Sequence, residues 1–136
     1  MKLCMIGTGY VGLVSGACFS DLGNSVICVD KDTKKIDNLK KGIIPIYEPG
    51  LDELVKKNYS SGKLKFTSNL KESVLKSDII FICVGTPTKR NSNAADLTQI
   101  YKLAKEISKY AKKFKIIIAK STVPITTGDK IEKIIS

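Results

Sequence analysis

A glycine-rich segment near the amino terminus has the residue types and spacing of a phosphate-binding turn. Gly7-Thr8-Gly9-Tyr10-Val11-Gly12 matches the pattern G-x-G-x-x-G, directly after the apolar run Lys2–Ile6 and before a helical stretch. In that context Gly7 permits a tight turn, Gly9 lets the backbone approach a pyrophosphate, and Gly12 lets the helix pack closely on the strand. The free N–H groups of the helix then stabilise the anion. Taken alone, the hexapeptide is a weak signal, because glycine-rich turns are common and a merely compact strand-to-helix turn would contain one too.

An acidic residue follows the next apolar run, where the same fingerprint requires one. Asp30 comes directly after Ser25–Val29. Its carboxylate can accept hydrogen bonds from an adenosine ribose and would repel a 2′-phosphate, which favours NAD over NADP. The preference for NAD over NADP is less sharp because three lysines follow, Lys31, Lys34 and Lys35. A lysine near Asp30 could offset its repulsion of a 2′-phosphate. A solvated helix start would explain the same lysines.

Two further polar loops follow apolar runs. Val84-Gly85-Thr86-Pro87-Thr88 comes at the end of Asp78–Val84, the most apolar run of the chain, and Lys120-Ser121-Thr122-Val123-Pro124 follows Lys115–Ala119. Ordinary turn chemistry could explain either loop alone. In a doubly wound sheet, however, ligands bind outside the carboxyl ends of the strands. The coincidence of four such segments therefore predicts a dinucleotide site at one edge of the sheet.

These segments are positioned by apolar runs that alternate with amphipathic stretches. Runs that are apolar at every residue indicate parallel strands covered on both faces. We expect strands over Lys2–Ile6, Ser25–Val29, Leu64–Thr67, Asp78–Val84 and Lys115–Ala119. Helices are expected over Tyr10–Leu22, from Asp32 to Gly42, over Leu51–Tyr59 and Leu70–Lys76, from Asp96 onward, and over Thr126–Ser136. The prediction is one α/β domain over residues 1–136, a doubly wound (Rossmann) mostly parallel sheet that stops within a late helix.

Local signals support several of these boundaries. Gly23 is placed to cap the first helix in a left-handed conformation, and Gly42 to end the second. Asp32 can cap the start of the second helix. Asp96, with Gln99 three residues later, resembles a capping box.

Composition limits the classes of protein to consider. The chain has 136 residues, 43% hydrophobic and 26% charged, as expected for one globular domain. No apolar run is long enough to span a bilayer, and the amino terminus does not read as a signal peptide, so we expect a cytoplasmic protein. The formal net charge is +10. The lysines form no cluster with arginines or aromatics, which argues against nucleic acid and favours smaller anions such as nucleotides.

The sequence offers little catalytic machinery. It contains no histidine, which removes Ser-His and Cys-His arrangements and histidine metal ligands. Its four cysteines, Cys4, Cys18, Cys28 and Cys83, lack metal or redox spacing, and we expect them to be small buried residues in a reducing compartment. Glu48 precedes Pro49-Gly50, which explains its segment as a helix entry. We therefore predict no metal site and no catalytic residue.

Several motifs together resemble a known family. They are Ile6 through Phe19, Cys28-Val29-Asp30-Lys31-Asp32 with Lys35-Ile36, Pro45 through Leu51, Gly85-Thr86-Pro87-Thr88, Ala94-Ala95-Asp96-Leu97 and Lys120 through Pro124. In this order they look like the amino-terminal part of the UDP-glucose 6-dehydrogenases, in the UDP-glucose/GDP-mannose dehydrogenase family. The match runs over essentially the whole chain. Its Tyr-Glu-Pro-Gly-Leu and Lys-Ser-Thr-Val-Pro segments are more specific than the glycine fingerprint.

The resemblance implies oxidation of UDP-glucose to UDP-glucuronate in two steps, with two NAD and a water. It implies that Gly7 through Gly12 hold the pyrophosphate, Asp30 and Lys35 the adenosine ribose, and Val84 through Thr88 the path of the nucleotide. Ser121, Thr122 and Val123 would reach the nicotinamide. Thr122 would also help to order the water, although its hydroxyl could instead satisfy a backbone group at a strand end. The expected cofactor-binding residues are thus Gly7, Thr8, Gly9, Tyr10, Val11, Gly12, Asp30, Lys35, Val84, Gly85, Thr86, Pro87, Thr88, Ser121, Thr122 and Val123.

The chain departs from the family in one large respect. The family's nucleophilic cysteine, lysine and acidic active-site residues lie in later segments, and none of the four cysteines here matches the catalytic position. We therefore expect the amino-terminal cofactor domain of a longer, homo-oligomeric enzyme, inactive alone, with UDP-glucose bound mainly by other domains. GDP-mannose or UDP-N-acetylmannosamine dehydrogenase, or a stand-alone nucleotide-binding module, remain alternatives. Neither nucleic acid nor a membrane is expected as a partner.

Overall fold

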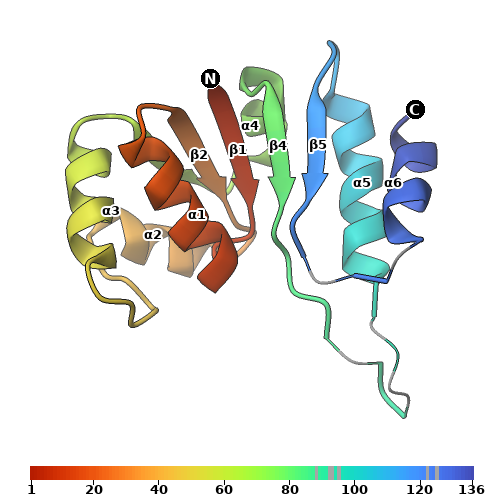
Figure 1. The fold of residues 1–136 in the computed structure, drawn as a ribbon, viewed down its shortest axis with the longest axis horizontal. Helices are drawn as coiled ribbons and strands as arrows, with labels where there is room; N and C mark the ends of the chain where they lie inside the picture. Colours follow the sequence, from red (N-terminus) through yellow and green to blue (C-terminus); the bar gives the residue numbers. More distant parts are fainter. Residues whose placement is uncertain (88, 92–93, 95, 122, 125) are drawn as a thin grey trace.

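One parallel sheet organises the chain (Figure 1). The computed structural model describes residues 1–87, 89–91, 94, 96–121, 123–124 and 126–136. The strands are β1 (Lys2–Ile6), β2 (Ser25–Val29), β3 (Leu64–Thr67), β4 (Ile79–Ile82) and β5 (Ile116–Ala119). The helices are α1 (Tyr10–Asp21), α2 (Thr33–Lys40), α3 (Leu51–Ser60), α4 (Leu70–Lys76), α5 (Thr98–Tyr110) and α6 (Thr127–Ile135).

The strand order β3-β2-β1-β4-β5 confirms the doubly wound fold. The chain moves outward from β1 to β3, returns past β1 to β4, and continues to β5, with every pair parallel. Ile6 is in register with Val29 of β2 and with Ile82 of β4. The three central strands therefore end at one level, and the segments that follow them come together at the same edge.

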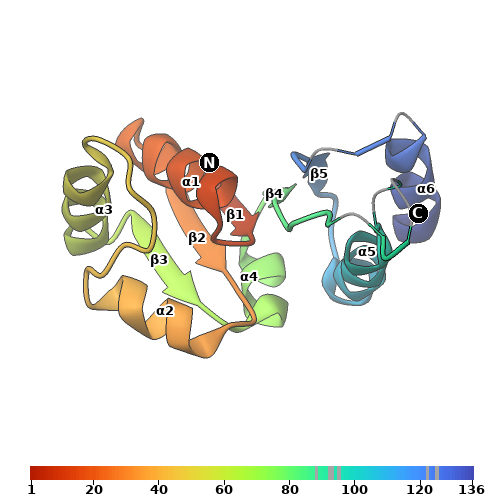
Figure 2. The same cartoon turned by 90° about the horizontal axis from the view of Figure 1, so that it is seen from below.

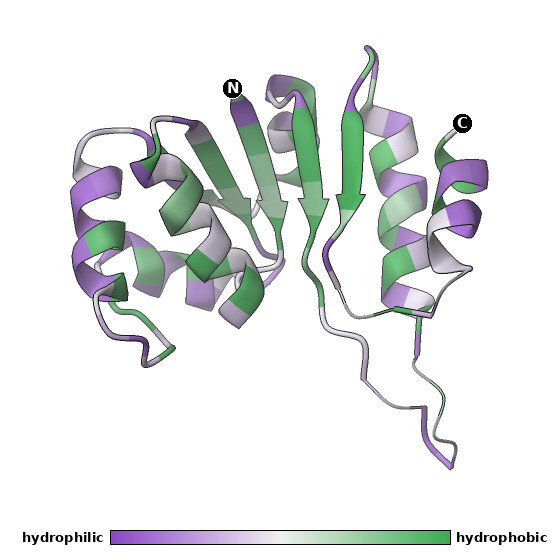
Figure 3. Cartoon of the chain, viewed as in Figure 1, coloured by the Kyte–Doolittle hydropathy of each residue, from purple (hydrophilic) through white to green (hydrophobic). Residues whose placement is uncertain are grey.

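Two apolar layers lie on opposite faces of the sheet. Side chains of α1, α2 and α3 join one core cluster, which includes Leu13, Ile36 and Val55. Side chains of α4, α5 and α6 join the other, which includes Val74 and Ile100. Figure 2 shows α1 and α3 on one side of the sheet and α4 and α5 on the other. In Figure 3 the strands are mostly hydrophobic, whereas the helices carry hydrophilic residues along part of their surface.

Three of the four predicted helix-end signals are confirmed. Gly23 and Gly42 have φ of 103° and 82°, in the left-handed region, and Asp32 accepts a hydrogen bond from the Lys35 amide at 3.1 Å. The expected capping box at Asp96 is wrong in detail. The N-cap of α5 is Leu97, and Asp96 accepts from the amide of Thr98 at 3.0 Å without a return bond from Gln99 among the described residues.

The edge strand β5 is the main departure from the predicted burial. Ile116 and Ile118 are 47% and 36% exposed, although an all-apolar strand was expected to be covered on both faces. They pair with Ile79 and Phe81 of β4, which belong to or pack against the core cluster that contains side chains of α1, α2 and α3. Figure 1 shows why they are open, because α1 and α3 cover the opposite end of the sheet. In the described part of the chain, no helix is long and apolar enough to cross a membrane.

Candidate functional site: a cavity at the carboxyl ends of the strands

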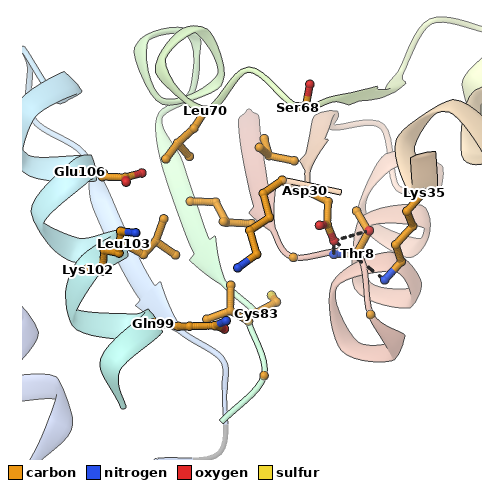
Figure 4. Close-up of a pocket in the computed structure, with 17 residues that line it drawn as sticks. Thr8, Asp30, Lys35, Ser68, Leu70, Cys83, Gln99, Lys102, Leu103 and Glu106 are labelled. Carbon is orange, nitrogen blue, oxygen red and sulfur yellow. Dashed lines mark hydrogen bonds and ion pairs between the residues drawn. The ribbon is translucent and has the colours of Figure 1, made fainter. Parts of the chain in front are cut away.

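A cavity of about 490 Å³ lies beyond the ends of β1, β2 and β4 (Figure 4). Its size falls within the range typical of small-molecule sites. One side is formed by the glycine turn and the segment after β2, and the other by α5. The lining residues are Ile6, Gly7, Thr8, Gly9, Val29, Asp30, Lys31, Lys35, Ser68, Leu70, Cys83, Val84, Gly85, Gln99, Lys102, Leu103 and Glu106.

The three glycines of the turn meet different geometric demands. Gly7 has φ of 104°, a left-handed conformation that side chains rarely adopt, and its amide donates to the Val29 carbonyl at 2.8 Å. A Cβ atom on Gly12 would lie 1.8 Å from the carbonyl oxygen of Gly7, so α1 can start this close to β1 only with glycine there. A Cβ atom on Gly9 would meet nothing within 4 Å. Gly9 therefore presents bare backbone to open space at the cavity wall.

The amino terminus of α1 is suited to an anion. Its N-cap is Gly9, no side chain caps it, and its first turn contains no acidic residue. The unpaired N–H groups and the positive end of the helix dipole are thus not neutralised by the helix's own side chains. A phosphate group of a dinucleotide fits this position, because the Gly9 backbone can be approached closely.

Asp30 is held firmly beside the turn. Its Oδ2 accepts from the Thr8 hydroxyl at 2.7 Å and from the Thr8 amide at 3.0 Å, and its Oδ1 accepts from the Asp32 amide at 3.0 Å. The Lys35 ammonium lies 3.9 Å from Oδ2. Burial by itself raises the pKa of Asp30, but the bonds from Asp32 and Thr8 and the charge of Lys35 together lower it. The cavity therefore contains a fixed carboxylate that is ionised at neutral pH.

The wall contributed by α5 was not anticipated from the sequence. Gln99, Lys102 and Glu106 line the cavity across from Asp30, with Leu103 between them (Figure 4). Their spacing along α5 is the one sequence signal that could have grouped them, since residues three and four apart share a helix face. That spacing does not reveal which ligand or element the face meets. Ser68 and Leu70, before and at the start of α4, also line the cavity. They were not predicted either, because their sequence does not show which element or ligand they face.

The expected cofactor-binding residues occupy different places around this cavity. Gly7, Thr8, Gly9, Asp30, Lys35, Val84 and Gly85 line it. Tyr10 and Val11 are exposed at the start of α1, and Gly12 is buried beneath the turn. Thr86 and Pro87 lie in the loop after β4, outside the set that lines the cavity. Thr88 and Thr122 lie outside the described residues.

The loop after β5 is joined to the end of β4. The Ser121 hydroxyl donates to the Val84 carbonyl at 2.7 Å and also contacts the Ile82 carbonyl at 3.2 Å. Val123 is partly buried and packs against the core cluster that contains side chains of α4, α5 and α6. Neither residue lines the cavity itself. Ser121 instead fixes the position of Val84, which does line it.

A second contact connects the glycine turn to a distant segment. The Tyr10 hydroxyl donates to Glu48 Oε2 at 2.8 Å, at the surface of the molecule, and this bond raises the pKa of Tyr10. Glu48 belongs to residues 43–50, which lead into α3. The contact gives Glu48 a structural role in joining that segment to α1, in keeping with the structural explanation of its motif.

The cysteines depart in part from the expected burial. Cys4 and Cys28 are buried, and burial raises the pKa of both thiols, that of Cys4 to about 12. The expectation is wrong for Cys18, which is exposed on α1, and for Cys83, which follows β4 and lines the cavity half-buried. Burial raises the pKa of Cys83 to about 11. Among the described residues, no three Cys, Asp or Glu side chains are grouped to hold a metal ion.

A doubly wound parallel sheet with a glycine turn, an open helix amino terminus and a carboxylate after the second strand defines a dinucleotide-binding domain. Comparison with known proteins makes this class more specific. The sequence model of the UDP-glucose/GDP-mannose dehydrogenase family, NAD binding domain, matches residues 1–136. The chain belongs to this family.

Relatives of the chain are sugar-nucleotide dehydrogenases by name. UDP-glucose 6-dehydrogenase of Rhizobium meliloti is 56% identical over 135 residues, which cover 99% of this chain and 31% of that protein. A GDP-mannose dehydrogenase structure from Pseudomonas aeruginosa, a ternary complex, has a TM-score of 0.91 at 38% identity over 99% of this chain and 32% of that one. The UDP-N-acetyl-mannosamine dehydrogenase of Staphylococcus aureus has a TM-score of 0.88 at 34% identity, over 99% and 32%. The chain thus spans about a third of the length of these relatives.

Proposed function

We propose that the chain is the NAD-binding part of a UDP-glucose 6-dehydrogenase, which oxidises UDP-glucose to UDP-glucuronate in two steps with two NAD. The observation that carries this proposal is the convergence of Gly9, the open amino terminus of α1 and the ionised Asp30 on one cavity. The relative with 56% identity, a UDP-glucose 6-dehydrogenase, favours UDP-glucose as the substrate.

In this proposal, each group of residues binds a different part of NAD. The turn Gly7 through Gly12 would hold the pyrophosphate with the free backbone amides at the amino terminus of α1, and Asp30 with Lys35 would hold the adenosine ribose. Val84, Gly85, Thr86, Pro87 and Thr88 would line the path of the nucleotide, and Ser121, Thr122 and Val123 would reach the nicotinamide end. When bound, NAD supplies the hydride acceptor for each oxidation step. The α5 residues Gln99 and Glu106 face the same cavity and can offer polar partners to the ligand.

This part of the protein contributes binding rather than catalysis in the proposal. Oxidation of an aldehyde to an acid needs a covalent thiol intermediate or an activated water. The chain has no histidine to serve as a base. Cys83, the cysteine that lines the cavity, has its pKa raised to about 11, so its thiol stays protonated at neutral pH. The nucleophile would come from other domains, as would most contacts to UDP-glucose.

GDP-mannose and UDP-N-acetylmannosamine are the alternative substrates. The solved structures with TM-scores of 0.91 and 0.88 are dehydrogenases for these sugars by name, and they share this fold. Because the fold of this part of the chain is shared with both, the proposed NAD chemistry does not depend on the sugar. We also propose a cytoplasmic, homo-oligomeric full-length enzyme, for which the four free cysteines are supporting evidence on the compartment.

Titration calorimetry with NAD and with NADP tests the cofactor assignment. We expect NAD to bind about tenfold or more tightly than NADP, and Asp30→Ala to narrow the difference, because the carboxylate both accepts from a ribose and repels a 2′-phosphate. Asp37→Ala is a matched control, since Asp37 is exposed on α2 away from the cavity. Equal affinities for the two cofactors in the unmodified protein would contradict the assignment.

Absorbance of NADH tests whether residues 1–136 bind NAD without catalysing the oxidation. Residues 1–136 mixed with NAD and UDP-glucose should bind NAD weakly and produce no NADH. Weak binding is expected because, in this proposal, other domains of the enzyme would close the nicotinamide end of the site. Sustained NADH production that disappears when one of the four cysteines is replaced would place the active site within this chain and overturn the proposal.

A further inference from the structure

Thr8 is an unusual residue within the glycine turn because all of its polar donors face one carboxylate oxygen. Its side chain is fully buried at 0% exposure. Both its hydroxyl and its amide donate to Oδ2 of Asp30, at 2.7 and 3.0 Å. The Thr8 amide, although part of the phosphate-binding pattern, therefore points to Asp30 and away from an anion.

The bonds to Asp30 leave its two oxygens in different states. A carboxylate has about four acceptor positions, two on each oxygen. Oδ2 accepts two hydrogen bonds, both from Thr8. Within the described part of the chain, Oδ1 accepts one hydrogen bond, from the Asp32 amide. The Lys35 ammonium at 3.9 Å from Oδ2 is beyond hydrogen-bond distance. One acceptor position thus stays open, on Oδ1, at the wall of the cavity.

We propose that Thr8 is a positioning residue for cofactor selection: it holds Oδ2 of Asp30 so that Oδ1 faces a ribose hydroxyl with its free acceptor position. This inference rests on the proposed NAD function. A carboxylate fixed before binding loses less rotational freedom when the ligand arrives, and its charge stays at the place where a 2′-phosphate would lie. Discrimination between NAD and NADP then depends on the Thr8 hydroxyl as well as on Asp30.

Other charged and titratable groups share this cavity and define the background of any test. They are Lys31 and Lys35 beside Asp30, Cys83 after β4, and Lys102 and Glu106 on α5. Asp32, before α2, does not line the cavity, but its amide donates to Asp30 Oδ1. None of them is altered by a substitution at Thr8. A change in the titration of Asp30 would therefore report the loss of the Thr8 hydroxyl.

Two pairs of variants isolate the hydroxyl. Thr8→Val keeps the branched shape and removes the hydroxyl, while Thr8→Ser keeps the hydroxyl. Thr8→Ser and Thr8→Ala differ by the hydroxyl alone and carry the test if valine does not fold. Thr127→Val is the matched control, because Thr127 is 1% exposed and its hydroxyl has no hydrogen-bond partner among the described residues.

Calorimetry with NAD and NADP is combined with a carboxyl ¹³C NMR titration of Asp30 in the free protein, assigned with Asp30→Asn. Thr8→Val and Thr8→Ala should weaken NAD binding about tenfold, reduce the preference over NADP, and raise the pKa of Asp30. Thr8→Ser and Thr127→Val should match the unmodified protein in NAD affinity, in the preference for NAD over NADP and in the pKa of Asp30. Folded Thr8→Val and Thr8→Ala with unchanged NAD affinity and unchanged Asp30 titration would overturn the role of Thr8. Absence of NAD binding by the unmodified protein would instead refute the proposed function, a separate result.

Discussion

The carbonyl oxygen of Gly7 occupies the space that a side chain on Gly12 would need, because a Cβ atom there would lie 1.8 Å away. The first and last glycines of the turn are thus coupled through one backbone contact. Gly7 itself is held by its left-handed φ and by its bond to the Val29 carbonyl, so it cannot move aside without disturbing β2. Gly9, between them, has no such neighbour.

This difference predicts opposite outcomes for two alanine substitutions. Gly12→Ala should lower the free energy of unfolding by about 3 kcal/mol, the upper part of the usual range for overpacking, because backbone must shift. Gly9→Ala should leave the free energy of unfolding unchanged or raise it slightly, since φ of −72° suits alanine. Urea denaturation measures both.

NAD affinity completes the comparison between the two glycines. Gly9→Ala should lose most NAD binding while staying folded, because its methyl group would project into the open space that the proposed function assigns to the pyrophosphate. A Gly9→Ala protein that binds NAD normally would show that the ligand does not approach this backbone. Normal stability of Gly12→Ala would show that the turn is looser than the contact with Gly7 indicates.

The sequence was sufficient for the fold because local and global signals agree. The ends of β1 and β2 follow from apolar runs that stop at Gly7 and Asp30, and Gly23 and Gly42 mark helix ends with a left-handed backbone. The turn and Asp30 were found because their chemistry is contained in short segments. Sequence reasoning could not place Gln99 or Glu106 at the cavity, since this depends on how α5 packs on the sheet.

Two other features depend on tertiary structure in the same way. Thr8 reads as part of the phosphate-binding pattern, and only the path of the chain after β2 brings its hydroxyl to Asp30. Ile116 and Ile118 read as core because their run is wholly apolar. Their exposure depends on where α1 and α3 lie, which the composition of β5 does not encode.

Stability should depend on pH through Asp30. Its pKa is lowered in the folded protein relative to the ordinary 3.8. A carboxyl with a depressed folded-state pKa stabilises the protein above its unfolded pKa, and this contribution is lost as the pH falls through the folded value. The unmodified protein should therefore exceed Asp30→Asn in unfolding free energy at pH 7, and the difference should shrink below pH 3.8. Urea denaturation across this range measures it, with Asp37→Asn as the control. A difference that grows on acidification would give the shift the opposite sign.

The four thiols should react with iodoacetamide in a fixed order at pH 8. Cys18 is exposed and should be modified first. Cys83 should react slowly, because burial raises its pKa to about 11, and NAD should slow it further by filling the cavity that it lines. Cys4 and Cys28 are buried and should react only on unfolding. Peptide mass spectrometry over time gives the order. Fast modification of Cys83 that NAD does not slow would place its sulfur outside the ligand site.

The open face of β5 predicts self-association of residues 1–136. Ile116 and Ile118 are exposed on the α1 side of the sheet, Phe114 just before them is 90% exposed, and β5 has one unpaired edge. An apolar edge strand of this kind pairs readily with another chain. Light scattering should therefore show oligomers or aggregates and a low, broad thermal transition. Ile116→Thr with Ile118→Thr keeps β-branched residues and should shift the protein toward monomer. Leu22→Thr, which changes an isolated residue 78% exposed at the end of α1, should leave association unchanged. A monodisperse monomer with a sharp transition at high temperature would show that this face needs no cover.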